Sequence, residues 1–482
     1  MALTREDKAL SPFNEHIAAL RSILSDEGVQ VGADAAAYEE GARFDRGVAA
    51  FVLRPTSTAE VSAAVSYCVR NEIPIVPQAG NTGVVSGSTP DASGTQAVLS
   101  LDRLSRNLRL DIDNRSVRAD AGILLSDLNA ALEPDGLFFP IDLGANPRLG
   151  GMLSTNAGGA RFLRYGDVRR NVLGITVVLA DPEGSIVTLG SSLRKNNTGV
   201  DWKQLFIGTS GAFGIITECV LNAERIPRQN AAALLVPSTP SAILPLLREI
   251  EGRVGEYLST FEAMSGNAIR LTLQSIPRLK NPFVGGQVPN YVLLVELTRT
   301  WEPRDGEQSL DKVLETALAE IWDTQPDLLA DALFGPSQQL WMLRHSIPEG
   351  LKQSGRLVSC DLAFQRGDVM KFCDTVTTEL PIRFPGVIMC DFGHVGDGGV
   401  HLSLVAPHGS EAALNPDLEG NLRSWIYEKA VNDFGGSYSG EHGIGRKNQA
   451  YYDKFTPERL KSWARAMKAV TSPSELGVPR LG

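Results

Sequence analysis

The alternation of apolar and polar positions near the start of the chain predicts a β-α-β unit. Residues 51–55 form a short apolar run that predicts a strand. Ser57 and Glu60 have the spacing of a capping box, so a helix is expected from there through Arg70. A second strand is expected at 74–76. Further strand signals follow at 97–101, 108–112 and 116–119. The first part of the chain is therefore expected to mix helices and strands.

Later in the chain, the pattern predicts a hairpin and then longer helices. The apolar segments 175–180 and 185–189 flank Asp-Pro-Glu-Gly at 181–184, whose Pro and Gly suit a type I turn. Glycine density falls after about residue 226, and helical periodicity appears at 241–254 and 309–322.

An amphipathic helix is expected at 457–470, after the glycine-rich residues 435–445. These changes in pattern predict three segments. Residues 1–226 form the first domain, residues 227–430 form a second one, and residues 431–482 return to the first domain.

Composition places the chain among globular proteins. Its 482 residues are 43% hydrophobic and 21% charged, which is enough apolar material for large cores. The net charge is −10 and no Lys/Arg cluster occurs, so a nucleic-acid partner is not expected.

The apolar run 172–180 is far shorter than the roughly 20 residues of a membrane-spanning helix. The first residues are charged and lack an apolar signal region, so a cytoplasmic location without a membrane span is expected. The five cysteines are scattered and form no Cys-x-x-Cys pair, which favours reduced, packed thiols.

Three glycine-rich segments indicate an extended ligand bound along the backbone. They are residues 77–87, residues 150–159 with Arg164-Tyr165-Gly166 after them, and residues 208–216. Glycine permits positive φ and close approach, so such loops can turn several N–H groups toward a pyrophosphate. None has the G-x-G-x-x-G spacing, and any one of them alone is equally consistent with a surface turn.

Two histidine-containing segments indicate a metal site or a hydrogen-bonded structural pair. Gly-His-Val-Gly-Asp-Gly-Gly-Val-His places His394 and His401 on either side of a glycine turn, which can bring two imidazoles to one point. Far along the chain, Gly-Glu-His-Gly-Ile-Gly contributes Glu441 and His442. The sequence has only six histidines, and these segments contain three of them.

The three loops, the hairpin and the segment Thr-Gly-Val-Asp-Trp-Lys-Gln-Leu-Phe at 198–206 resemble the FAD-binding domain of the vanillyl-alcohol oxidase and p-cresol methylhydroxylase superfamily. The resemblance implies an α+β fold, with a two-part FAD-binding domain and an α+β substrate domain built on an antiparallel sheet. It also implies FAD contacts from Pro77, Gln78, Ala79, Gly80, Asn81, Thr82, Gly83, Ser86, Gly87, Gly150, Gly151, Ser154, Thr155, Asn156, Gly158, Gly159, Arg164, Tyr165, Gly166, Gly211, Gly214, Ile215 and Ile216.

The same resemblance implies non-covalent FAD. Some members of the superfamily attach the flavin to a histidine in the first loop, where this chain has Asn81. No histidine lies between His16 and His345, so this loop cannot form the link.

The histidine segments are similar to the Gly-His-Val-Gly-Asp-Gly and Glu-His-Gly-Ile-Gly signatures of the FAD-dependent D-2-hydroxy-acid dehydrogenases. That similarity implies that His394, His401 and Glu441 ligate zinc, or alternatively manganese, and that His442 is the catalytic base. It also implies electron transfer from FAD to an electron-transfer flavoprotein, a quinone or a cytochrome. It leaves a homodimer open.

Substrate contacts are expected around Arg344, whose counterpart in the family binds a substrate carboxylate. The chain departs from the family pattern nearby. Ser359 stands where relatives have a lysine, Pro348 where the D-2-hydroxyglutarate enzymes have a threonine, and Gly399 and Ser403 where asparagines are usual. Ser359 and Ser403 are therefore expected to set which D-2-hydroxy acid is used. Two nearby cations that could replace the lysine are Lys352 and Arg356.

Three alternatives to this function are considered. An alkyl-glycerone-phosphate-synthase-like transferase uses the same FAD scaffold, although the histidine pair favours the dehydrogenase. A flavoprotein with a purely structural metal site and an oxygen-dependent 2-hydroxy-acid oxidase also remain open.

Overall fold

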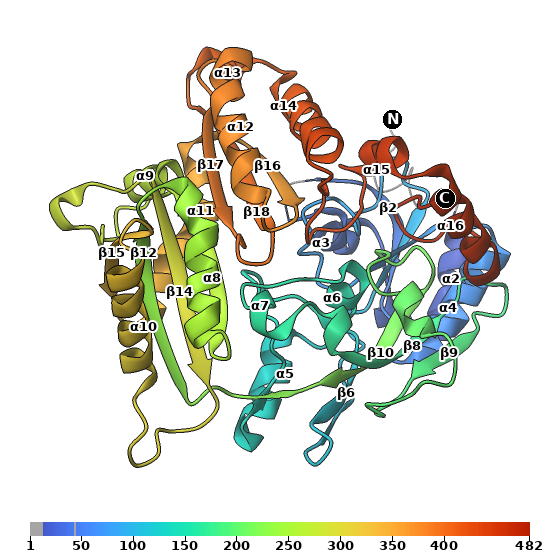
Figure 1. Ribbon diagram of the computed structural model, residues 1–482. Helices are drawn as coiled ribbons and strands as arrows, with labels where there is room; N and C mark the ends of the chain where they lie inside the picture. The colour runs from blue at the N-terminus through green and yellow to red at the C-terminus, as the bar shows by residue number, and fades with distance from the viewer. Residues whose placement is uncertain (1–12, 43–44) are drawn as a thin grey trace. The chain divides into compact units, whose positions relative to one another are not determined.

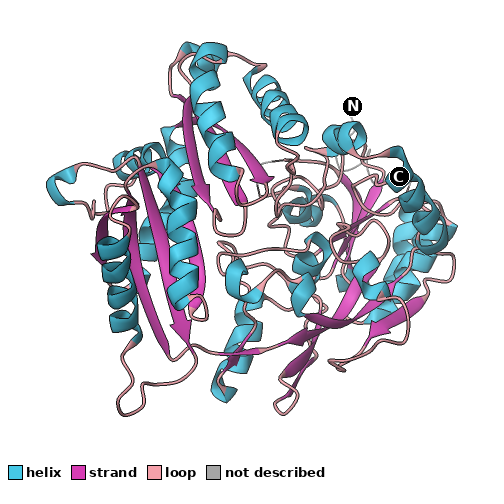
Figure 2. Ribbon diagram, viewed as in Figure 1, coloured by secondary structure: helices cyan, strands magenta, loops and turns pink. Residues whose placement is uncertain are grey.

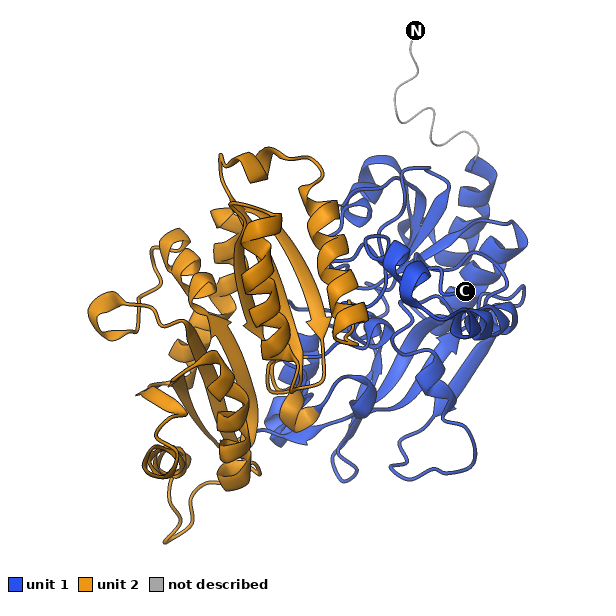
Figure 3. Ribbon diagram, turned by 45° about the horizontal axis from the view of Figure 1, so that its top comes forward, with its two compact units in different colours: residues 1–158, 166–226, 441–482 blue, residues 159–165, 227–440 orange. Residues whose placement is uncertain are grey.

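The computed structural model describes residues 13–42 and 45–482, and it divides into two compact units. Unit 1 contains the described residues up to Gly158 together with Gly166–Ile226 and Glu441–Gly482, and unit 2 contains Gly159–Tyr165 and Pro227–Gly440 (Figure 3). The glycine-rich residues 435–440 thus belong to unit 2, whereas the sequence pattern predicted them in the returning segment.

Unit 1 begins with the predicted β-α-β arrangement. Its first sheet has the order β1-β2-β4-β3, in which β2 and β3 both pair in parallel with β4. Ser57 Oγ accepts the N–H of Glu60 at 3.2 Å, which confirms the predicted helix start. The Glu60 carboxylate accepts the N–H of Thr56 instead of Ser57, at 2.6 Å. The elements are α2 (Asn14–Leu24), β1 (Val29–Gln30), α3 (Ala36–Glu39), β2 (Ala49–Leu53), α4 (Thr58–Arg70), β3 (Ile75–Gln78) and β4 (Gln96–Ser100).

The second sheet of unit 1 has five antiparallel strands in the order β5-β6-β10-β8-β9. Strands β8 and β9 form the predicted hairpin, whose turn is closed by the N–H of Gly184 on the carbonyl of Asp181 at 3.1 Å. The strands are β5 (Leu108–Asp111), β6 (Ser116–Asp120), β8 (Val172–Val178), β9 (Ile186–Gly190) and β10 (Ile215–Asn222). The remaining elements are α5 (Leu125–Leu132), β7 (Leu137–Phe138), α6 (Leu149–Thr155), β11 (Glu224–Arg225), α15 (Gln449–Phe455) and α16 (Glu458–Thr471).

Unit 2 is built on a seven-stranded antiparallel sheet in the order β15-β12-β14-β13-β17-β18-β16 (Figure 1). Most of its strands are buried apolar runs, which is the pattern expected of a sheet covered by helices. They are β12 (Gln229–Pro237), β13 (Leu258–Ser265), β14 (Tyr291–Arg299), β15 (Leu329–Phe334), β16 (Gly355–Ala363), β17 (Ile388–Gly393) and β18 (Gly399–Pro407).

Helices α9 (Gly266–Ser275) and α11 (Ser337–Ser354) pack together on one face of this sheet, where residues such as Met264 and Phe392 complete an apolar core. In Figure 2, helices lie alongside the strands of this sheet. Other helices contact the same sheet or follow it, namely α7 (Phe162–Tyr165), α8 (Ile243–Val254), α10 (Leu310–Thr324), α12 (Val369–Arg383), α13 (Glu411–Leu414) and α14 (Leu418–Glu428). The predicted α+β class with an antiparallel sheet is confirmed.

Two further expectations concern the cysteines and membrane-spanning helices. All five cysteines are free and buried. Within the described residues, no helix combines the length and the apolar character needed to cross a bilayer.

Candidate functional site

The three glycine-rich segments come together within unit 1. The N–H of Ser210 in the third segment donates to the carbonyl of Ser154 in the second at 2.7 Å. Gly211 has φ +80°, and a Cβ placed on it would lie 3.4 Å from Pro77 Cγ in the first segment. Segments far apart in the sequence therefore form one glycine-rich surface.

Several residues of these segments have unusual backbone conformations. Asn81, Ser86, Asn156 and Ser210 have positive φ values of 50°, 59°, 52° and 51° although none of them is glycine. Such conformations cost about 1–3 kcal/mol each and cluster at ligand sites. Asn81 is held by its side chain, which donates to the carbonyl of Glu40 at 2.8 Å and accepts from Ser88 Oγ at 2.8 Å. The surface is thus preorganised by local side-chain bonds.

The loop with Glu441 and His442 belongs to the same unit and contacts this surface. A Cβ on Gly158 would lie 2.6 Å from Glu441 Oε1, so the carboxylate packs directly on a glycine of the second segment. Gly443 has φ +70° and lies against Ser210 Oγ, which is 3.4 Å from its Cβ position. Unit 1 therefore places Glu441 and His442 beside the glycine-rich surface.

Three of the residues expected to contact FAD lie in the short segment of unit 2. Gly159, Arg164 and Tyr165 are in or next to α7, and Arg164 Nη1 donates to the carbonyl of Glu256 at 2.8 Å. Gly166 belongs to unit 1.

A tight turn between β17 and β18 brings His394 and His401 together in unit 2. The carbonyl of His394 accepts the N–H groups of residues 397, 398 and 399 at 3.0–3.1 Å, which folds the chain back on itself. The two Nε2 atoms lie 3.2 Å apart. Glycine is needed before the turn, because Gly393 has φ +120° and a Cβ there would lie 2.9 Å from His401 Cδ2.

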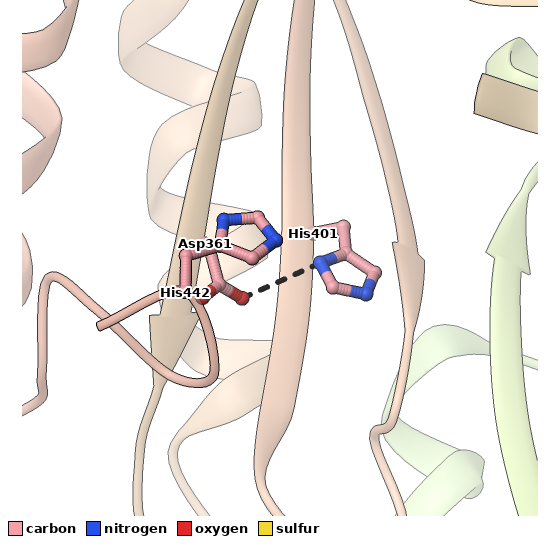
Figure 4. Close-up of side chains that lie close together, drawn as sticks. All are labelled: Asp361, His401 and His442. Atoms are coloured by element: carbon pink, nitrogen blue, oxygen red, sulfur yellow. Dashed lines mark ion pairs between the residues drawn. The ribbon is translucent and has the colours of Figure 1, made fainter. Parts of the chain in front are cut away.

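Each imidazole has a carboxylate at its other nitrogen. Glu262 Oε1 lies 2.5 Å from Nδ1 of His394, and Asp361 Oδ1 lies 3.4 Å from Nδ1 of His401 (Figure 4). Neither carboxylate was predicted from the sequence. The signal that could have found them is one acidic residue within each of two largely apolar strands, Glu262 in β13 and Asp361 in β16. Acidic residues are rarely buried unless they are paired, so each of them indicates a partner.

This donor set fits a divalent metal ion. When both Nδ1 atoms carry the proton and face carboxylates, each Nε2 is unprotonated and keeps its lone pair. Two such lone pairs 3.2 Å apart repel each other unless a cation lies between them. Two nitrogens that ligate a tetrahedral zinc at 2.0–2.1 Å are separated by roughly 3.3 Å. The observed spacing matches that value.

Arg344 on α11 completes this cluster. Its Nε donates to the second oxygen of Glu262, and its guanidinium lies over the Phe392 ring, 4.8 Å from the centroid. The side chain is only 9% exposed, yet within the described residues its Nη atoms donate to no protein acceptor. Burial alone raises the pKa of Glu262, but Arg344 and then His394 outweigh it and hold that pKa well below its usual value.

Ser359 and Ser403 lie two residue pairs from Asp361 and His401, and therefore on the same sheet face. Ser359 is paired with Ser403 across β16 and β18, as Asp361 is with His401. Two residues along a strand span roughly 6.6 Å, so this hydroxyl pair is about that far from the His401 row. The Oγ atoms are 3.4 Å apart, which is long for a hydroxyl hydrogen bond.

The alternative cations lie elsewhere. Arg356 is an odd number of residues from Ser359 on β16, so it faces the opposite side of the sheet. There its guanidinium donates to the carbonyls of Ala413 and Pro416. Lys352 is exposed on α11.

Comparisons with known proteins identify the family. Residues 49–190 match the FAD-binding domain family, and residues 226–479 match the C-terminal domain of FAD-linked oxidases. A D-2-hydroxyglutarate–pyruvate transhydrogenase of Saccharomyces cerevisiae is 32% identical, covering 92% of this chain and 89% of the relative. A mitochondrial D-2-hydroxyglutarate dehydrogenase of Rattus norvegicus is 34% identical over 89% of this chain and 77% of the relative. A putative mitochondrial D-lactate dehydrogenase of Schizosaccharomyces pombe is 30% identical over 90% and 82%.

Solved structures show the same fold at low identity. p-Cresol methylhydroxylase aligns with a TM-score of 0.68 and 14% identity, covering 96% of this chain and 95% of that one. An alkyldihydroxyacetonephosphate synthase aligns with a TM-score of 0.69 and 16% identity, covering 96% and 85%. From the family matches, the chain belongs to the FAD-linked oxidases and is an FAD-dependent oxidoreductase of the D-2-hydroxy-acid dehydrogenase family.

Proposed function

We propose that this enzyme oxidises a small D-2-hydroxy acid to the 2-oxo acid with a bound divalent metal, and that His442 removes the hydroxyl proton. The observation that carries the proposal is the pair of imidazoles whose Nε2 atoms lie 3.2 Å apart while a carboxylate faces each Nδ1. Metal-binding histidines are typically oriented in this way.

The glycine-rich surface of unit 1 is the proposed FAD site. Backbone amides beside Asn81, Asn156 and Ser210 would hold the pyrophosphate, because positive φ turns successive N–H groups toward one point. Without a histidine at position 81, the cofactor would be held non-covalently through this loop. FAD, when bound, supplies the acceptor for the substrate's α-hydrogen and two electrons.

His394, His401 and Glu441 are the residues proposed to hold the metal. Two imidazoles and a carboxylate suit zinc, with manganese as the alternative. Such an ion, when bound, supplies Lewis-acid stabilisation that lowers the pKa of a ligated hydroxyl.

Arg344 and His442 have complementary proposed roles. The buried guanidinium would bind the substrate carboxylate through its Nη atoms, which no described protein group occupies. The bond from Nε to Glu262 fixes the orientation of the guanidinium, so its two Nη groups are positioned before the substrate arrives. His442, on the glycine-flanked loop of unit 1, would accept the hydroxyl proton at a ring nitrogen near neutral pH.

Anaerobic flavin reduction tests this proposal directly. Purified protein with and without prolonged chelator treatment is mixed with D- and L-2-hydroxy acids while flavin absorbance is followed. We expect D-acids alone to bleach the flavin, and chelation or His401→Ala to abolish bleaching while FAD stays bound. Full activity in protein shown to be metal-free by elemental analysis would contradict the metal's role.

The same assay separates the alternatives. A net transferase would show no lasting flavin reduction by a hydroxy acid, and an oxygen-dependent oxidase would form peroxide in air. We propose an electron-transfer flavoprotein, quinone or cytochrome as acceptor, to be tested by reoxidation of the reduced enzyme with each. The homodimer and the cytoplasmic location stay predictions.

A further inference from the structure

We propose that Glu262 is a positioning residue that orients a metal-binding imidazole and the substrate-binding guanidinium at the same time. This inference rests on the proposed function, because it assigns Glu262 a role through His394 and Arg344. It predicts that one substitution at this carboxylate weakens both metal binding and substrate binding.

The geometry of Glu262 is unusual because each oxygen serves a different group. Oε1 lies 2.5 Å from His394 Nδ1, and Oε2 accepts from Arg344 Nε. The Glu262 side chain is only 1% exposed, so water does not compete for either oxygen. The residue comes from β13, whereas its partners come from the turn after β17 and from α11.

Both partners are donors, which requires an acceptor at each oxygen. A proton on His394 Nδ1, which lies 2.5 Å from Glu262 Oε1, leaves Nε2 with the lone pair that a metal needs. With Nε of Arg344 held, the two Nη groups remain available for a carboxylate. A glutamine has one acceptor oxygen and one donor NH₂ group, so Glu262→Gln would leave one partner facing another donor.

Two neighbouring carboxylates provide matched controls. Asp361 contacts His401 but makes no hydrogen bond or ion pair with Arg344 among the described residues. Glu296 on β14 also anchors α11, since it accepts from Ser337 Oγ at 2.8 Å and from Trp341 Nε1 at 3.0 Å. It has no such contact with either imidazole in the described chain.

The experiment compares full-length Glu262→Gln, Asp361→Asn and Glu296→Gln with the natural enzyme. Zinc affinity is measured by competition with a chromophoric chelator, and KM and kcat for a D-2-hydroxy acid are measured at saturating zinc. We expect Glu262→Gln to weaken zinc binding about 10- to 100-fold, the usual effect of losing an outer-shell partner. At saturating zinc its KM should remain raised at least about tenfold, the factor that 1.4 kcal/mol of lost binding produces.

The controls should separate the two effects. Asp361→Asn is expected to weaken zinc binding but to recover a normal KM at saturating zinc. Glu296→Gln is expected to lower Tm without changing zinc affinity.

Unchanged zinc affinity and KM in Glu262→Gln would overturn the inference, and so would an equal KM defect in Asp361→Asn. If Glu262→Gln does not fold, Glu262→Asp gives the same readouts, because the shorter carboxylate cannot reach both partners. Failure of the natural enzyme to bind zinc or manganese would overturn the metal proposal itself, which distinguishes the two failures.

Discussion

The glycine-rich surface of unit 1 and the helix-covered sheet face of unit 2 use different chemistry. In unit 1 the available groups are mainly backbone amides on loops with positive φ, such as those at Asn81 and Asn156. In unit 2 they are side chains brought together from β13, β16, β18 and α11. A backbone site depends on glycine and space, whereas a side-chain site depends on charge and hydrogen-bond partners. Substitutions should therefore separate cofactor binding from the chemistry of the substrate.

The largest expected effect is at His442. This residue is an exception to the division, because it is a proposed catalytic side chain that lies on a loop of unit 1. We expect His442→Ala to slow anaerobic flavin reduction by about 10²- to 10⁴-fold, the range for losing a positioned general base. FAD content should be unchanged. Stopped-flow absorbance at saturating substrate measures the rate.

His408→Ala is the matched control, because His408 is exposed just after β18 and its ring contacts the carbonyl of Gln353 at 3.2 Å, away from the paired imidazoles. Its reduction rate should equal that of the natural enzyme. Unaltered kinetics in His442→Ala would remove this residue from the mechanism.

The backbone side of the comparison is tested at Gly83. A Cβ on Gly83 would meet no protein atom within 4 Å, so alanine should leave the stability of the apoprotein unchanged. If FAD occupies that space, the added methyl should clash with it at a cost of about 1–3 kcal/mol, which raises the FAD Kd by roughly 5- to 150-fold. Titration of apoprotein with FAD measures the Kd.

Gly252→Ala is the corresponding change in unit 2. Gly252 lies within α8 and also has open space at its Cβ position. Alanine there should leave the FAD Kd unaltered and raise stability by about 0.5–1 kcal/mol through helix propensity. Equal FAD Kd values for Gly83→Ala and the natural enzyme would show that FAD does not approach Gly83.

Specificity should depend on the hydroxyl pair of unit 2. Ser359 offers a neutral hydroxyl where relatives have a lysine, so a charge-assisted bond of about 1.5–3 kcal/mol is replaced by one of about 0.5–1.5. We expect lower kcat/KM on D-2-hydroxyglutarate than on at least one other D-2-hydroxy acid. Ser359→Lys should raise kcat/KM on D-2-hydroxyglutarate by roughly fivefold, the factor for about 1 kcal/mol. The comparison covers D-lactate, D-malate and aromatic acids.

Arg356→Gln serves as the control because Arg356 faces the other side of β16 and donates to backbone carbonyls there. It should leave the order of substrates unaltered. If D-2-hydroxyglutarate is already the best substrate and the lysine does not improve it, Ser359 does not set specificity.

The same contrast explains what the sequence could predict. The glycine-rich segments, the hairpin and helix α4 are contiguous patterns, and local rules of turn and capping chemistry are sufficient for them. The pairing of His394 with His401 follows from a short turn between them. Glu262 and Asp361 were missed because only strand register brings Asp361 opposite His401, and only packing against α11 brings Glu262 to Arg344. Register and helix packing depend on contacts between distant segments, which a local pattern does not encode.

The smallest expected effect on catalysis concerns an ion pair in unit 1. Asp102 accepts from Arg54 Nη2 at 2.7 Å and from the Tyr38 hydroxyl at 2.9 Å. The Asp102 and Arg54 side chains are 17% and 26% exposed, so solvent screens the pair only in part. Because removing the charge of Asp102 weakens its bonds to Arg54 and Tyr38, Asp102→Asn should lower the free energy of unfolding by about 1–3 kcal/mol at pH 7. Flavin reduction by substrate should be unaffected.

The pH dependence of that loss identifies its cause. Burial raises the pKa of Asp102, but the bonds from Arg54 and then Tyr38 outweigh it and leave the pKa below its ordinary value. A carboxyl with a depressed folded pKa stabilises the protein above its unfolded pKa of about 3.9, and this stabilisation is lost as pH falls through the folded value. Urea unfolding of both proteins should therefore show a gap that is constant from pH 7 to about 5 and narrows below about pH 4. A gap that stays constant through this acid range would mean that the substituted amide disturbs packing and that the charge of Asp102 contributes nothing.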